Sequence, residues 1–322
     1  MSNARKLADN LPSVGQLSNR NLIINGAMQV AQRGTSFTGD GYSLDRIYHQ
    51  LSGGTSTLTQ ETFALGSELE GFTKYAKQAV STGNNYCGIV YKVEDVKSLP
   101  QGKATFSFYA KGTNPAAGSF DLKILRMHNG STTHDTLLDT TVTLTSSWQR
   151  FTKTFDVGSL SGMSTPTADS IIYISIRQAG SDTGTAAWEL NLTGLQLEVG
   201  SQASPFEHEP AGVTLSKCQR YFQHHQGDYY TIFLNGTKDD SHAYLSGSLS
   251  QVMRAKPSFS TANCYLYGRP SATVSYTATE NRCNTSYATI GFTNVTGSID
   301  AGEGVRFESN NSTGYVRYDA EL

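Results

Sequence analysis

Tyrosine is the side chain of this sequence that is best suited to binding chemistry. The chain contains 17 tyrosines, and Tyr229, Tyr230, Tyr265 and Tyr267 lie in short strand-like stretches of its C-terminal third. A tyrosine ring can stack on a sugar ring while its hydroxyl makes a directed hydrogen bond. Tyrosine is also a common strand residue, so each of the four could serve packing alone. These four are the candidate receptor contacts.

Histidine raises the question of a metal site. His208, His224, His225 and His242 lie loosely together along the sequence, whereas a zinc site needs three or four convergent ligands. On a strand, the adjacent residues His224 and His225 would point to opposite faces. We therefore expect no metal ion and no cofactor.

Catalytic motifs are absent from the sequence. It contains no GxSxG elbow, no HExxH and no P-loop. A glycan-cleaving enzyme would need two carboxylates in one cleft, and the long β-helix repeats on which capsule-degrading spikes are commonly built are also missing. We expect that the protein is not an enzyme.

Composition narrows the class of protein further. Charged residues make up 16% of the 322 residues, the net charge is -2, and there are 31 glycines, which suits many short strands joined by tight turns. A nucleic-acid partner is not expected, because such binding needs clustered Lys and Arg. No stretch approaches the roughly 20 apolar residues that span a bilayer, so membrane insertion is not expected either.

The four cysteines form no CxxC pair. A disulfide between Cys264 and Cys283 is conceivable, because both lie in the C-terminal third. Buried free thiols are the more ordinary alternative.

Alternating apolar residues indicate strands. Phe106, Phe108 and Ala110 share one face of a strand, and similar runs follow at 119–125, 148–157 and 171–177. Turn residues separate these runs and no helical segment of useful length interrupts them. This spacing predicts an antiparallel sandwich or barrel.

The stretch 188–199 is expected to close this sheet. The apolar residues of Trp188–Leu192 occupy one parity, and those of Leu195–Val199 occupy the other. A slip of one residue would turn the second set to solvent. A β-bulge at Gly194 would restore the common face.

The chain therefore divides into four parts. Residues 1–20 form an N-terminal segment that holds the only helix we expect, and so short a helix needs a partner to be stable. Residues 21–208 form the first β domain, 209–226 a linker that begins near two prolines, and 227–322 a smaller C-terminal β-sandwich that extends to the last residue.

Several motifs, in a shared order, resemble bacteriophage virion appendage proteins, chiefly tail fibres. They lie at Asn21–Thr35, Tyr42–Arg46, Gly194–Ser201, Ser204–His208, Cys218–Phe222, Met253–Pro257 and Tyr318–Leu322. The opening Met1–Asp9 is similar to short N-terminal segments of marine and cyanobacterial phage fibres.

Three further stretches look like a jelly roll of the carbohydrate-binding-module type. They are Phe106–Gly112, Ser147–Phe155 and Trp188–Glu198. In such folds the tryptophan of the "Trp-Gln" strand is usually core or rim, so Trp148 is expected to be structural. Trp188 is expected in the core.

The resemblance implies a homotrimeric tail fibre, made in the host cytoplasm and found in the virion. Its N-terminus would bind a tail adaptor or nozzle protein, and its β domains would contact a host cell-surface polysaccharide. The anchoring residues would be Ser2, Asn3, Arg5, Leu7 and Leu11. Two alternatives stay open: a capsid fibre or decoration protein, and a stand-alone non-catalytic carbohydrate-binding module.

Overall fold

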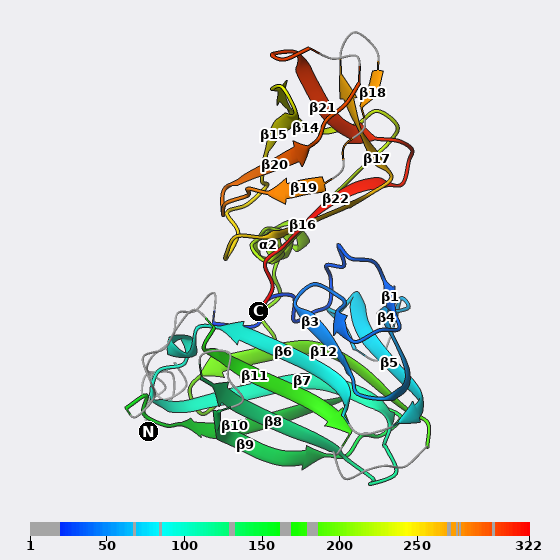
Figure 1. Ribbon diagram of the computed structural model, residues 1–322. Coiled ribbons are helices and arrows are strands. Elements are labelled where there is room, and N and C mark those ends of the chain that lie inside the picture. Colours follow the sequence, from blue (N-terminus) through cyan, green and yellow to red (C-terminus); the bar gives the residue numbers. More distant parts are fainter. Residues whose placement is uncertain are drawn as a thin grey trace. The chain divides into compact units, whose positions relative to one another are not determined.

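The structure is a computed structural model, and it describes residues 20–66, 69–83, 86–128, 133–161, 169–178, 186–268, 272–274, 276, 278–297 and 300–322. The chain forms two compact units (Figure 1). The first extends to Thr214 and also includes Leu322, and the second comprises Leu215–Glu321. Both are built from antiparallel strands, so the prediction of an all-β fold is confirmed.

The first unit is a jelly-roll sandwich of two six-stranded sheets. The first sheet has the order β1-β4-β5-β12-β7-β10 and the second has the order β2-β3-β6-β11-β8-β9 (Figure 1). The strands of the first sheet are β1 (Ser36–Phe37), β4 (Gly54–Thr62), β5 (Lys74–Gly83), β7 (Gly102–Thr113), β10 (Gln149–Val157) and β12 (Trp188–Val199). Those of the second sheet are β2 (Gly41–Tyr42), β3 (Ile47–Leu51), β6 (Cys87–Glu94), β8 (Phe120–Met127), β9 (His134–Val142) and β11 (Ile171–Gln178), and the 3-10 turn η1 (Val96–Ser98) follows β6.

The two sheets share one core. Phe106 and Phe108 of β7 and Phe120 of β8 are fully buried in it, together with the branched residues of β11. Trp188 is also buried, as expected, and its indole Nε1 donates to Gln178 Oε1 at 2.9 Å. The alternation that predicted strands from the sequence is therefore the alternation between core and outer face.

The predicted bulge in β12 is confirmed. The pairing of β12 with β7 shifts register between Thr193 and Gln196, and Gly194 has a φ of 63°. Leu192 and Leu195, although three positions apart, both lie in the core. A left-handed φ is accessible to glycine at little cost, which explains why this residue stands at the bulge.

The N-terminal stretch of the first unit is hydrogen-bonded along β12 at the bulge. Leu195 N donates to Gly26 O at 3.0 Å, and Leu22 N donates to Leu197 O at 3.0 Å. A Cβ at Gly26 would lie 2.2 Å from Leu195 O, so only glycine fits there. The backbone groups that the bulge removes from the ladder thus find new partners.

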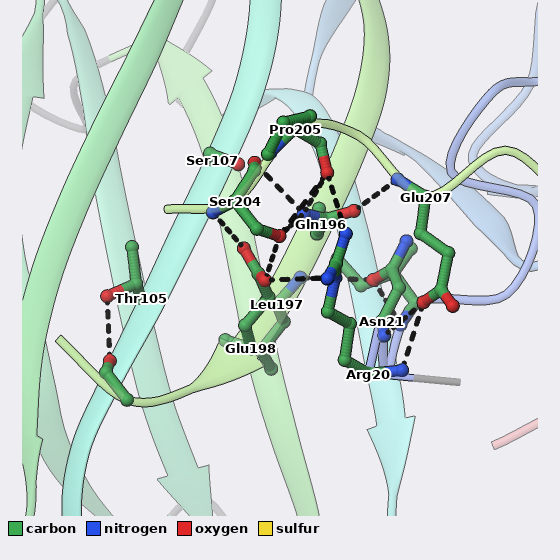
Figure 2. Close-up of polar contacts among 12 residues, drawn as sticks. Arg20, Asn21, Thr105, Ser107, Gln196, Leu197, Glu198, Ser204, Pro205 and Glu207 are labelled. Atoms are coloured by element: carbon green, nitrogen blue, oxygen red, sulfur yellow. Dashed lines mark hydrogen bonds and ion pairs between the residues drawn. The ribbon is translucent and has the colours of Figure 1, made fainter. Parts of the chain in front are cut away.

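Asn21 fixes the same stretch through its side chain. Its Nδ2 donates to Leu195 O at 3.1 Å, and its Oδ1 accepts from Leu197 N at 3.1 Å (Figure 2). Glu207 Oε2 accepts from the backbone nitrogens of Arg20 and Asn21 at 2.9 and 3.0 Å. Residues from both ends of the first unit therefore meet on one strand.

The exit loop after β12 is held by buried polar side chains. Glu198 Oε2 accepts from Ser204 N at 3.1 Å, and Gln196 Nε2 donates to Ser204 Oγ at 3.1 Å (Figure 2). Arg20 Nε lies 3.5 Å from Glu198 Oε1. The polar residues that alternate with the leucines of β12 are therefore paired rather than solvated.

A buried polar cluster links the two sheets. His49 Nε2 lies 2.9 Å from Ser56 Oγ, to which Gln78 Nε2 donates at 3.2 Å. All three side chains are buried. Burial lowers the pKa of His49, although a hydrogen bond to the backbone of Gly39 and the charge of Asp40 oppose the shift.

This cluster should make the first unit sensitive to acid. The pKa of His49 is about 6.5 in the unfolded chain and lower in the folded one. The stability that this difference in pKa contributes is therefore fully present above pH 6.5. It is lost as the pH falls below 6.5, because only the unfolded chain then takes up the proton. We expect the melting temperature of the first unit to fall below pH 6.5, and to fall less in His49→Gln. Parallel losses in the two proteins would contradict this role of His49.

The second unit is a smaller sandwich of two antiparallel sheets. One has the order β18-β17-β21-β14-β15-β20-β19 and the other has the order β13-β22-β16. Their strands are β13 (Phe222–Gly227), β14 (Ile232–Lys238), β15 (His242–Ser248), β16 (Ser258–Ala262), β17 (Cys264–Gly268), β18 (Ala272–Val274), β19 (Ala278–Asn281), β20 (Tyr287–Thr293), β21 (Gly304–Ser309) and β22 (Gly314–Asp319). Phe292, Phe307 and Tyr318 are prominent in the shared core.

The interval that was expected to be a linker, 209–226, contains a helix and a strand. Helix α2 (Ala211–Gln219) follows Pro210, whose carbonyl accepts from Val213 N and Thr214 N, and β13 belongs to the smaller sheet of the second unit. The expectation that the N-terminal segment holds the only helix is therefore wrong. Thr214 and Cys218, four residues apart and both buried, give the short helix its buried side.

All four cysteines are free thiols, so the conceivable Cys264–Cys283 disulfide is not formed. Within the described part of the chain, no helix is long and apolar enough to cross a membrane. The proposed anchoring residues Ser2, Asn3, Arg5, Leu7 and Leu11 lie outside the described residues.

Candidate functional site

The structure brings the four predicted tyrosines to one face of the second unit. Tyr265 and Tyr267 lie on β17, which pairs with β21 so that Tyr265 is opposite Glu308 and Tyr267 is opposite Arg306. The alternate residues, such as Leu266 and Phe307, point into the core. The two tyrosines, Arg306 and Glu308 therefore share the outer face.

The other two tyrosines come from the loop between β13 and β14. Tyr230 N donates to Ser309 O at 3.1 Å, and Ser309 N donates to Thr231 O at 2.9 Å, which ties this loop to the end of β21. Tyr229 and Tyr230 are 54% and 60% exposed, and their ring centres lie 4.2 Å apart in an edge-on arrangement. A hydrogen bond and the charge of Tyr229 raise the pKa of Tyr230, with smaller contributions from burial, Glu308 and Tyr267.

A buried ion pair lies beneath these rings. The Glu308 side chain has no exposed surface, and its Oε2 lies 2.6 Å from Arg306 Nε. The Arg306 guanidinium in turn lies 4.6 Å from the ring centre of Tyr267. Burial raises the pKa of Tyr265, and a hydrogen bond to Glu308 and the charge of Glu308 raise it further. We call Tyr229, Tyr230, Tyr265, Tyr267, Arg306 and Glu308 the tyrosine cluster.

The burial of Glu308 is the unusual feature of the tyrosine cluster. Glutamate is almost never fully buried unless it is paired, and a buried ion pair is weak evidence of a gain in stability. The buried carboxylate holds the partly exposed guanidinium of Arg306 in a set position, where it offers charged donor atoms, while the exposed rings of Tyr229 and Tyr230 offer stacking surfaces. The cluster can therefore hold a ring that carries hydroxyl groups.

The same geometry gives no catalytic pair. Glu308 is the only carboxylate of the tyrosine cluster, whereas hydrolysis of a glycosidic bond ordinarily uses two. Among the residues that the structure describes, no group of three or more His, Cys, Asp and Glu side chains could hold a metal ion.

The four histidines do not form one site. His208 packs against the rings of Phe72 and Phe206. His224 contacts Tyr315 with ring centres 5.2 Å apart, and His225 contacts Tyr318 at 6.0 Å; His242 stacks on Tyr244. Each histidine therefore has its own ring neighbour.

Arg306 and Glu308 were not singled out from the sequence as functional residues. Their alternation with Val305 and Phe307 placed them on the outer face of a strand, which is where charged residues are ordinary. Their role depends on the partner strand β17 and on the loop at 228–231, and both are distant in sequence. The four tyrosines could be selected because their residue type alone suggested stacking.

The chain matches no protein-family model, and no curated protein matches it. Among solved structures it is similar to a CBM4 structure, with 24% identity, 39% of this chain and 84% of that chain covered, and a TM-score of 0.30. The N-terminal cellulose-binding domain of Cellulomonas fimi β-1,4-glucanase C is 18% identical, with 55% and 95% covered and a TM-score of 0.32. The enzymatically active domain of tailspike protein 4 of bacteriophage CBA120 is 12% identical, with 56% and 22% covered and a TM-score of 0.35. These likenesses are too weak to assign a function.

Proposed function

We propose that this protein is a non-catalytic binding protein that recognises a cell-surface glycan through the tyrosine cluster. One observation carries the proposal: tyrosines from two separate segments converge over a fully buried carboxylate that is paired with a guanidinium. Sugars present hydroxyl oxygens that accept from a guanidinium and hydroxyl groups that bond to tyrosine hydroxyls, and they present apolar ring faces to tyrosine. The cluster supplies a partner for each of these features.

Substitution of one ring of the tyrosine cluster should weaken glycan binding. The purified protein would be screened against an array of bacterial surface polysaccharides, and the affinity for each bound polysaccharide would be measured for Tyr230→Ala and Tyr267→Ala. We expect each variant to bind at least about tenfold more weakly, which corresponds to about 1.4 kcal/mol, because rings at the centre of an interface dominate its energy.

Tyr287 provides the matched control for this experiment. It is 58% exposed, close to the 60% of Tyr230, and it begins β20 of the same unit but is not part of the tyrosine cluster. Tyr287→Ala should bind as the wild type does. Equal affinities for all these proteins, or a loss as large in Tyr287→Ala, would refute the proposed site.

We also propose that the protein acts as an appendage of a phage virion, a homotrimeric tail fibre. The ordered sequence motifs from Asn21 to Leu322 support this proposal, and a capsid fibre or decoration protein is the alternative. The N-terminal segment would attach to a tail adaptor or nozzle protein, and the host surface would be contacted by the β domains. Labelling of intact particles with a specific antibody, viewed by electron microscopy, should place the protein on the tail. Label only on the capsid would favour the alternative.

A further inference from the structure

The outer face of the first sheet of the first unit carries a second set of exposed polar and aromatic side chains. The strand register aligns them in rows across β4, β5, β12 and β7. One row consists of Thr57, Ala79, Glu189 and Thr113, and the next consists of Thr59, Lys77, Asn191 and Lys111. Rows two residues apart lie about 7 Å apart along the strands.

Three aromatic side chains bridge this face. Trp148 immediately precedes β10, and its ring centre lies 5.5 Å from that of Tyr75 on β5 and 5.3 Å from that of Phe63. In the sheet, β12 and β7 separate β5 from β10, so the two strands are roughly 14 Å apart at about 4.8 Å per strand. Rings that meet across this span must lie over the central strands. All three rings are partly exposed.

The charged and polar residues of these two rows lie beside the aromatic bridge. Lys77 Nζ lies 2.8 Å from Glu189 Oε2, and Asn191 Nδ2 donates to Glu189 Oε1 at 2.7 Å. Lys111 Nζ lies 5.4 Å from the ring centre of Trp148. Glu189 and Glu61, which lies opposite Tyr75, match the charges of the two lysines. The two rows and Glu61 therefore offer hydrogen-bond donors and acceptors, and their positive and negative charges are equal in number.

A groove adjoins these two rows. Its volume is about 460 Å³, and its lining includes Thr57, Ala79, Thr113 and Glu189, the four residues of the first row. Ligand pockets in proteins commonly have volumes of about 300–1,000 Å³. Glu189 belongs both to the groove and to the ion pair with Lys77, so the two features are continuous.

We propose that this face of the first unit is a binding site for a neutral sugar chain, separate from the tyrosine cluster. A chain laid along the strands would reach from the groove over Glu189 and Lys77 to the aromatic bridge. The hydroxyl groups of the sugars would bond to the ion pair and to Asn191, and one sugar ring would pack on Trp148 or Tyr75. A charged ligand would find no net opposite charge among the residues of these two rows and Glu61.

Tryptophan fluorescence can isolate this site, because the chain has two tryptophans. Trp188 is buried in the core and bonded to Gln178, although it also contributes to the lining of the groove, so a ligand over the aromatic bridge should change chiefly the emission of Trp148. The full chain would be titrated with four neutral hexasaccharides, which are β-1,4-, β-1,3- and α-1,4-linked glucose and β-1,4-linked xylose. We expect a saturable change in emission with at least one of them.

Variants distinguish this site from the tyrosine cluster. Trp148→Phe should remove most of the emission change, and Trp148→Leu should weaken binding measured by calorimetry at least about tenfold. The double variant Tyr229→Ala/Tyr230→Ala, in the second unit, should keep the full emission change. The inference is overturned if no hexasaccharide changes the emission, if the full change persists in Trp148→Phe, or if Trp148→Leu binds as the wild type does. None of these outcomes bears on the tyrosine cluster, which the polysaccharide array tests separately.

Discussion

Gly194→Val is expected to destabilise the first unit severely, because a β-branched residue is a genuine outlier at the left-handed φ of 63° and its Cβ would lie 2.8 Å from the ring of Tyr109. The bulge at Gly194 is what allows Leu192 and Leu195 to lie in one core, although they differ in parity. If Gly194 stayed in the strand without forming the bulge, Leu195 and Leu197 would turn to the outer face, and Gln196 and Glu198 would turn inward.

The expected size of this effect approaches the stability of a whole domain. Each exposed leucine forfeits about 1.5–3 kcal/mol, and a carboxylate buried without a partner costs several kcal/mol more. A typical domain is stable by only about 5–15 kcal/mol. The Gly194→Val variant must either keep the bulge under strain or lose this burial, so its first unit should unfold at a much lower denaturant concentration than that of the wild type.

Tryptophan emission during chemical denaturation measures this transition, because Trp148 and Trp188 both lie in the first unit. Gly194→Ala is the control, since it keeps the register. It should cost only about 1–3 kcal/mol, through the left-handed φ of 63° and contact with the rings of Tyr109 and Phe72. If Gly194→Val unfolds at the same denaturant concentration as the wild type, the bulge does not depend on glycine at this position.

Glu308→Ala is expected to abolish glycan binding and to destabilise the second unit. The substitution removes the charge that pairs with Arg306 and that helps to raise the pKa of Tyr265. Breaking a fully buried ion pair costs about 3–5 kcal/mol. The side chain of Arg306 is 35% exposed, so solvent offsets part of this cost and we expect about 1–3 kcal/mol. Binding should weaken by at least about a hundredfold.

An exposed ion pair of the same unit provides the control. Arg282 Nη2 lies 2.8 Å from Glu280 Oε2, with side chains that are 53% and 46% exposed. Glu280→Ala should change the free energy of unfolding by less than about 1 kcal/mol and leave binding intact. Calorimetry with a polysaccharide selected on the array, together with thermal unfolding, gives both quantities. Equal losses in the two variants would show that the burial of Glu308 has no special role.

Features that depend on one strand alone could be predicted from the sequence. The parity change across Gly194 predicted the bulge, and the alternation around Phe106 predicted the sandwich, because both follow from the two-residue period of a strand. Helix α2 escaped prediction because nine residues with two buried positions carry little periodic signal.

Features that depend on pairing between distant strands could not be predicted. Glu308 is buried only because Tyr265 and the loop at 228–231 reach it from other parts of the chain. Trp148 was expected to be structural, and its partly exposed ring packs against Tyr75 across two intervening strands, a contact that the sequence did not predict. Neither contact is indicated by the residues that lie next to it in the sequence.

Nuclear magnetic resonance of tyrosine rings tests the central claim most directly. The protein would be prepared with ¹³C-labelled tyrosine, and the ring signals of Tyr229, Tyr230, Tyr265 and Tyr267 would be assigned with single Tyr→Phe variants. On titration with a polysaccharide fragment that the protein binds, these four of the 17 tyrosines should shift in a saturable way, while Tyr287 stays unchanged. A bound fragment that leaves all four signals unmoved would contradict the tyrosine cluster as the glycan site.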